Sequence, residues 1–178
     1  MDVDLPQLFE NALAQFAHDE RDLVRSGVSE RSLCGRFAMI LEPMAHQLGL
    51  TDYRADIEYN RNGADVIKGY IRHEYHDLVQ ITCDVILHAR GRRFPDNLIA
   101  IEMKRDIHPP QYKESDRQRL IALTTAEQKF FDDQGAEIPH VSGYHVGYFL
   151  EIQDRERYAI EEYIAGALSR SWVFALER

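Results

Sequence analysis

Two apolar runs that carry charged residues at their ends constrain the fold of this chain more than any other feature. The first is Thr82-Cys83-Asp84-Val85-Ile86-Leu87, and the second, residues 97–104, ends in Glu102-Met103-Lys104. Side chains alternate across a strand, so Glu102 and Lys104 share one face while Met103 points to the other. Antiparallel pairing of the runs brings Asp84 onto the face of Glu102. The sequence therefore predicts two carboxylates and an ammonium at one end of two paired strands.

This grouping of charges suits a divalent cation. Hard cations such as magnesium take oxygen ligands from one or two carboxylates and retain waters that can meet a phosphate. A lysine beside such an ion can orient one of those waters. The alternative interpretation is structural, with Glu102 and Lys104 closing the solvated end of a buried strand as a salt bridge. An aspartate on the preceding run favours the metal site.

The two runs resemble the PD-(D/E)XK nuclease superfamily. The matching pieces are residues 81–87 and 98–104. By this resemblance, Asp84 corresponds to the first metal-binding aspartate, Glu102 to the acidic residue of the second half-motif and Lys104 to its lysine. Met103 would lend its backbone carbonyl as a further metal ligand. Cys83 stands where the family has its proline, which departs from the motif without removing a group that the chemistry needs.

The resemblance implies both a fold and a function. It implies an α/β fold of the restriction-endonuclease-like type, a sandwich with a mixed central β-sheet flanked by helices. The implied activity is hydrolysis of phosphodiester bonds with Mg²⁺ or Mn²⁺ as cofactor, and DNA is favoured over RNA as the substrate. The alternative is a domain of the same fold that binds nucleic acid or a protein and no longer cuts. Whether the chain forms a homodimer that cuts both strands of a duplex is left open by the sequence.

A third carboxylate is expected from an early helix. Many superfamily members place a glutamate from such a helix beside the metal, and Glu30 lies in the first turn of the matching element. The competing role is structural, because an acid in the first turn offsets the positive end of the helix dipole by up to about 1 kcal/mol. Glu10 and Glu42 are weaker candidates for the same position.

Three residues are candidates for contact with the nucleic-acid backbone. Arg61 ends the first expected strand, and Gln118 and Arg119 open the helix expected after the second charged run. The simpler interpretation is that Arg61 is solvated. Asp116, beside the latter two, is expected to be the N-cap of that helix. Strand alternation predicts that Cys83 faces away from the site.

Composition limits the remaining possibilities. The 178 residues suit a single domain, 1–178, and 44% hydrophobic residues can form a sizeable core. The chain has no apolar run long enough for a bilayer and its start is unlike a secretory signal, so we expect a cytoplasmic protein without membrane association.

The two cysteines, Cys34 and Cys83, are too few for a disulfide framework or a cysteine zinc site. No glycine-rich phosphate loop or nucleophile elbow is present, which argues against triphosphatases and α/β-hydrolases.

Charge is spread unevenly along the chain. The net charge of −9 argues against a protein that coats nucleic acid. Between His88 and Arg119, however, eight lysines and arginines accompany five acids. We expect this basic stretch to surround the acidic pair, or else to solubilise an exposed hairpin.

The pattern of apolar residues predicts the order of the elements. Apolar residues at helical spacing over 5–24, with Asp4 as N-cap and Gly27 after them, predict a first helix. The other expected elements are a helix from Ser29 to just before Gly49, strands at 56–61, 81–87 and 97–104, a helix from Ser115 or Asp116, a strand at 143–152, a helix at 155–169 and a docked tail at 172–176.

Overall fold

The centre of the molecule is a mixed six-stranded sheet with the strand order β1-β6-β7-β10-β11-β12. Only β7 and β10 run parallel within this sheet, and its other neighbours are antiparallel. The strands are β1 (Arg54–Tyr59), β6 (Cys83–His88), β7 (Asn97–Arg105), β10 (Val146–Gln153), β11 (Arg157–Ile164) and β12 (Ala167–Ala175). The predicted α/β class with a mixed sheet is confirmed.

The computed structural model describes residues 3–59, 61–62, 66–67, 69–72, 77–80, 82–126, 130–131, 137–138 and 142–176, with side chains described at 3–59, 82–126 and 142–176. Short strand pairs accompany the main sheet. They are β2 (Arg61–Asn62) with β3 (Val66–Ile67), β4 (Gly69–Arg72) with β5 (Asp77–Gln80), and β8 (Phe130–Phe131) with β9 (Glu137–Ile138).

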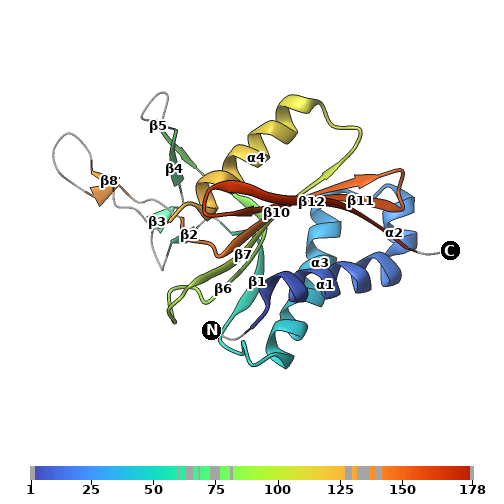
Figure 1. Ribbon diagram of the computed structural model, residues 1–178, viewed down its shortest axis with the longest axis horizontal. Coiled ribbons are helices and arrows are strands. Elements are labelled where there is room, and N and C mark those ends of the chain that lie inside the picture. The colour runs from blue at the N-terminus through green and yellow to red at the C-terminus, as the bar shows by residue number, and fades with distance from the viewer. Residues whose placement is uncertain are drawn as a thin grey trace.

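Helices cover both faces of the sheet (Figure 1). One face carries α1 (Leu5–Asp19), α2 (Arg21–Ser26) and α3 (Glu30–Gln47), and the other carries α4 (Pro110–Thr124). Asp4 caps α1 by accepting a hydrogen bond from the Gln7 amide, and Ser29 caps α3 by accepting one from the Ser32 amide. The expected first helix is interrupted at Glu20, where the backbone leaves helical geometry and α2 begins. None of the helices in the described residues is long and apolar enough to cross a membrane.

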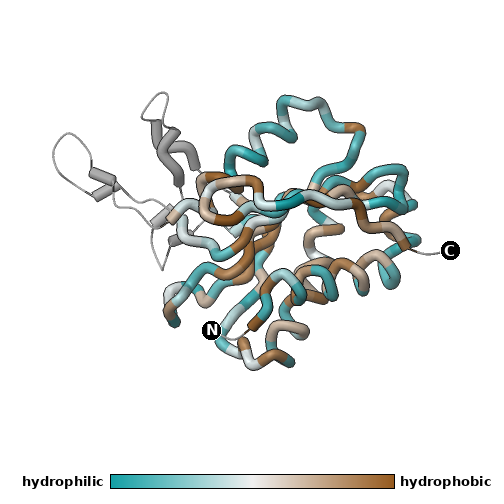
Figure 2. Tube along the Cα trace, viewed as in Figure 1, coloured by the Kyte–Doolittle hydropathy of each residue, from teal (hydrophilic) through white to brown (hydrophobic). Residues whose placement is uncertain are grey.

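The alternation of β7 separates two apolar cores. Ile99, Ile101 and Met103 pack with the aromatic residues of α1 and α3, while Ala100 packs with α4. Within the larger core, the rings of Phe9 and Tyr148 are stacked with centroids 3.7 Å apart. Apolar residues are concentrated in the central strands and on the sheet-facing sides of the helices (Figure 2). The parity argument for residues 99–103 is thereby confirmed.

Gly147 sets how closely α4 approaches the sheet. A Cβ atom on Gly147 would lie 3.0 Å from Thr124 Cγ2 and 3.2 Å from Leu120 Cδ2, which is closer than ordinary contact. The C-terminal half of α4 therefore rests directly on the backbone of β10. This contact fixes the helix that contributes two residues to the charged cluster described below.

Two further regions differ from the sequence predictions. Residues 155–169 and the expected tail form the β11–β12 hairpin rather than a helix and a tail. The buried residues Tyr158 and Ile160 alternate with more exposed neighbours, as in a strand. The turn residues Ala165 and Gly166 both adopt positive φ, as a tight hairpin turn requires. Helix α4 begins at Pro110 rather than near Ser115, because a proline is tolerated in the first turn, where its missing amide has no helical partner.

The contact between α1 and α3 yields a prediction about stability. Phe37 on α3 is fully buried, with its ring centroid 5.4 Å from that of Phe16. Phe37→Ala should lower the free energy of unfolding by about 3–5 kcal/mol, because it removes buried surface and leaves a cavity. Urea denaturation would measure this loss. Met39→Ala, on the same helix but 65% exposed, should change stability by less than about 0.5 kcal/mol. Equal effects of the two substitutions would contradict the described packing.

Candidate functional site

The predicted convergence of Asp84 and Lys104 is present at the end of β7. The paired part of β6 and β7 ends with Val85 opposite Ile101, and Asp84 and Glu102 are the next residues beyond this pair on the two strands. Asp84 Oδ2 accepts a hydrogen bond of 2.8 Å from the Met103 amide. The N–H and C=O of one strand residue point to the same side, so the Met103 carbonyl also faces this end of β6.

The Lys104 ammonium lies within a group of carboxylates. Its Nζ is 3.5 Å from Asp84 Oδ2, 3.5 Å from Glu30 Oε2 and 3.3 Å from Asp116 Oδ2. It is also 3.3 Å from the Met103 carbonyl oxygen. Burial alone would lower the pKa of Lys104, but the surrounding carboxylates raise it above its ordinary value of 10.5. The lysine is therefore a charged hydrogen-bond donor at neutral pH.

Glu102 is the most buried charged residue of this cluster. Its exposed fraction is 0%, and Oε1 accepts a hydrogen bond of 2.7 Å from the Arg119 guanidinium. Oε2 is buried and has no hydrogen-bond partner among the described residues. Burial, followed by the charge of Asp84, raises the pKa of Glu102 well above its ordinary value of 4.5.

Helix α4 supplies Asp116 and Arg119 to the cluster. Arg119 NH1 lies 3.2 Å from Asp116 Oδ1 and so joins this carboxylate to Glu102. The expectation that Asp116 is an N-cap is wrong, because α4 starts six residues earlier, at Pro110. Sequence reasoning missed its place in the site. The available signal was spacing, since Asp116 lies four residues before the buried Leu120 and hence on the same inward face of the helix.

Glu30 occupies the place expected for a third carboxylate. Its Oε2 faces Lys104. Its Oε1 accepts a hydrogen bond of 2.8 Å from the Arg105 amide and lies 2.8 Å from His108 Nε2. These contacts connect the start of α3 to the segment after β7. The other two candidates lie elsewhere, because Glu10 pairs with Arg170 and Glu42 accepts a hydrogen bond from the Ala55 amide.

The charge balance and the atom types of this carboxylate cluster fit a hard divalent cation. The cluster has four carboxylates, those of Glu30, Asp84, Glu102 and Asp116, and two cations, Lys104 and Arg119, so its net charge is −2 when all four acids are ionised, as they would be around a bound cation. Unpaired Glu102 Oε2, Asp84 and the Met103 carbonyl all offer oxygen. Within residues whose side chains are described, no three histidine, cysteine, aspartate or glutamate side chains are already grouped to hold a metal. The ammonium occupies the space between three of the carboxylates.

Of the residues proposed to contact nucleic acid whose side chains are described, Arg119 lies at the carboxylate cluster and Gln118 does not. Gln118 donates a hydrogen bond of 2.7 Å to Glu114 on the exposed side of α4. Arg119 points inward to Glu102 instead of outward to a phosphate. The Arg61 side chain lies outside the described residues. The structure thus gives Arg119 a structural and electrostatic role that the sequence did not predict.

The basic stretch surrounds the acidic pair only in part: Lys104 contacts Asp84 and Arg119 contacts Glu102, but other members lie elsewhere. Arg90 and Arg93 follow the far end of β6 and pair with Asp56 and Asp52, respectively. Cations nearer the carboxylate cluster are also paired: Lys113 lies 3.1 Å from Glu151, and Arg117 makes two hydrogen bonds of 2.8 Å to Glu161. Charge content along the sequence therefore indicated the site only through Lys104 and Arg119, and the other cations named here are paired outside it.

The orientation predicted for Cys83 is also wrong. Cys83 packs on the α4 side with Ile86 and Ala100, and its thiol lies 3.2 Å from the Ile101 carbonyl oxygen. Cys83 is paired with Tyr59 of β1, which packs on the same side, and Glu58 before Tyr59 has a positive φ that interrupts the regular alternation of β1. Burial, together with the nearby charges of Glu102 and Asp84, raises the pKa of the thiol well above 9.0.

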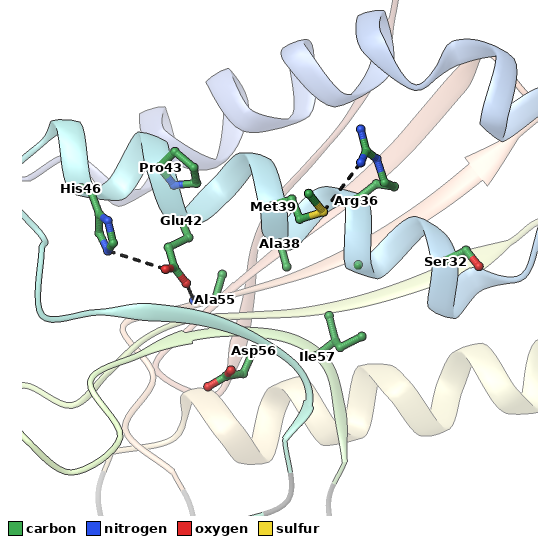
Figure 3. Close-up of a pocket in the computed structure, with 11 residues that line it drawn as sticks. Ser32, Arg36, Ala38, Met39, Glu42, Pro43, His46, Ala55, Asp56 and Ile57 are labelled. Atoms are coloured by element: carbon green, nitrogen blue, oxygen red, sulfur yellow. Dashed lines mark hydrogen bonds and ion pairs between the residues drawn. The ribbon is translucent and has the colours of Figure 1, made fainter.

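A separate groove runs between α3 and the edge strand β1 (Figure 3). Its volume is about 760 Å³, and its lining combines apolar groups, such as Met39 and Ile57, with the carboxylate of Glu42. None of Asp84, Glu102 and Lys104 lines it. The groove is therefore distinct from the carboxylate cluster.

Comparison of the chain with protein-family models, curated proteins and solved structures found no match. The functional argument consequently rests on the residues and their geometry.

The raised pKa of Glu102 predicts a pH dependence of stability. In metal-free protein, folding takes up a proton at Glu102 between its ordinary pKa of 4.5 and its raised folded value, so stability falls as the pH rises through this window. Glu102→Gln should reduce this fall. Urea unfolding midpoints from about pH 5 to about pH 8 would measure it. A parental pH slope in this variant would contradict the described environment of Glu102.

Glu161→Gln is the matched control. Burial alone would raise the pKa of Glu161, but hydrogen bonds from Arg117 and Tyr163 lower it below its ordinary value of 4.5. Its charged form therefore contributes stability above this pH, and the contribution is lost as the pH falls. This substitution should lower stability at neutral pH and should not reduce the fall between about pH 5 and about pH 8.

Proposed function

We propose that this chain is a metal-dependent phosphodiesterase of the PD-(D/E)XK type that cuts nucleic acid, with DNA favoured over RNA as the substrate. The supporting observation is the fully buried Glu102, which has one unpartnered oxygen in a cluster with excess negative charge. Burial of an unpaired anionic oxygen is costly unless a cation offsets it. The restriction-endonuclease-like arrangement is part of the same proposal.

Asp84, Glu102 and the Met103 carbonyl would hold Mg²⁺ or Mn²⁺, with Glu30 at the border of the site. The ion would polarise the phosphate and lower the pKa of a bound water. Lys104 is protonated, so it donates hydrogen bonds to that water or to a phosphate oxygen and does not accept a proton. Arg119 fixes the orientation of the Glu102 carboxylate through Oε1 and leaves Oε2 for the ion.

One observation favours the second candidate, a domain of this fold that binds a nucleic acid or a protein without cutting. Lys104 contacts three carboxylates, and the nearby cations Arg117 and Arg119 are paired within the molecule. A site organised by internal ion pairs can be purely structural. Turnover separates the two candidates, because only the first predicts product.

The test is cleavage of labelled single-stranded DNA, duplex DNA and RNA with Mg²⁺ or Mn²⁺. Asp84→Asn retains an acceptor for the Met103 amide but removes the charge, and it should lower the cleavage rate by roughly a hundredfold or more. Lys104→Met should do the same. Glu114→Gln, an exposed change on α4, should cut at the parental rate.

Thermal melting must show that each variant is folded before its rate is interpreted. Cleavage that survives both Asp84→Asn and Lys104→Met would contradict the proposed site. A parent that is folded and loaded with metal, yet cuts none of the substrates, would favour the binding domain.

A further inference from the structure

The position of Lys104 suggests a role beyond orientation of water. Its ammonium is 3.3–3.5 Å from one oxygen each of Asp84, Glu30 and Asp116. Its side chain is only 16% exposed, so water screens these contacts weakly. The ammonium also donates a hydrogen bond of 3.3 Å to the Met103 carbonyl oxygen, so the three carboxylates act on it mainly through their charge. The lysine thus neutralises charge at a place where an external cation would also be attracted.

Part of the carboxylate cluster has no cationic partner. Glu102 Oε2 is buried without a hydrogen bond, although Oε1 of the same carboxylate is held by Arg119. This unpaired oxygen is an independent sign that the cluster can accept a further cation. An external ion between Glu102 and Asp84 would share Asp84 with the ammonium.

The surrounding contacts indicate which group can move. Asp84 is fixed by the Met103 amide at 2.8 Å, and Asp116 is fixed by Arg119 at 3.2 Å. Lys104 carries its charge on a flexible four-carbon chain. A shift of the ammonium from Asp84 toward Asp116 therefore requires only side-chain rotation.

We propose that Lys104 is an internal counter-ion that competes with a divalent cation for Asp84, and that Asp116 is the positioning residue that retains its ammonium when the cation binds. This proposal rests on the proposed function, because it assumes a metal site at Asp84 and Glu102. It adds that metal affinity is limited by the chain's own lysine. Asp116 acts through Lys104 and needs no contact with the metal.

Calorimetric titration with Mn²⁺ tests the competition without reference to cleavage. Lys104→Met should bind Mn²⁺ roughly tenfold more tightly than the parent, because the competing charge is gone. Lys104→Gln serves the same purpose if the methionine variant does not fold. Lys113→Met is the matched control, since its ammonium pairs with Glu151 and not with Asp84, and it should bind Mn²⁺ as the parent does.

A double-mutant cycle tests the role of Asp116. In the parent, Asp116→Asn should weaken Mn²⁺ binding several-fold, because the ammonium loses its alternative partner and stays at Asp84. With Lys104→Met already present, Asp116→Asn should have little effect. Equal weakening in both backgrounds would overturn the proposal, since Asp116 would then act as a ligand or through its charge alone.

The outcomes separate this inference from the proposed function. If the parent binds Mn²⁺ and neither Lys104 variant binds it more tightly, the internal counter-ion is overturned while the metal site stands. If the parent binds weakly and the lysine variants bind clearly, the competition is supported even without detectable cleavage. If parent and variants all fail to bind Mn²⁺, both proposals fail.

Discussion

Antiparallel pairing of β6 with β7 determines where the two cores and the carboxylate cluster lie. The register that places Val85 opposite Ile101 directs Ile99, Ile101 and Met103 into the larger core. A slip of one residue would exchange the two faces of β7 and bury Lys104 among aromatic rings. Hydrophobic burial along the strand therefore specifies the position of the charged residues at its end.

The end of β7 is less favourable for stability than its middle. Glu102 is fully buried, and its one guanidinium partner leaves an oxygen without a hydrogen bond. A buried ion pair rarely stabilises a fold as much as apolar side chains of the same volume would. The carboxylate cluster therefore opposes folding to some extent, whereas the apolar contacts on both sides of the sheet favour it. Charges retained in such a place are typical of a functional site, although structural ion-pair networks also occur.

The sequence predicted those features that depend on short periodicity. The faces of β7, the cap of α1 and the start of α3 near Ser29 follow from local patterns, and each agrees with the structure. The prediction of a helix at 155–169 overlooked that Tyr158 and Ile160 are two residues apart, a spacing that shares a face in a strand but not in a helix, and pairing with β10 and β12 fixes the strand. Asp116 was missed because its role depends on where α4 starts and on how closely Gly147 lets that helix approach.

Ion pairing within the molecule bears on how a nucleic acid would be bound. The chain has a net charge of −9, and Arg90, Arg93, Lys113, Arg117 and Arg119 are all paired with acids. Cations already engaged in this way contribute little to phosphate binding, because their release from carboxylates costs about as much as the new contact returns. Lys104 is likewise engaged, by three carboxylates, so attraction for a phosphate backbone at this cluster depends mainly on a bound divalent cation. Metal and substrate would then bind interdependently, since the ion both neutralises the carboxylates and supplies positive charge that the surface there lacks.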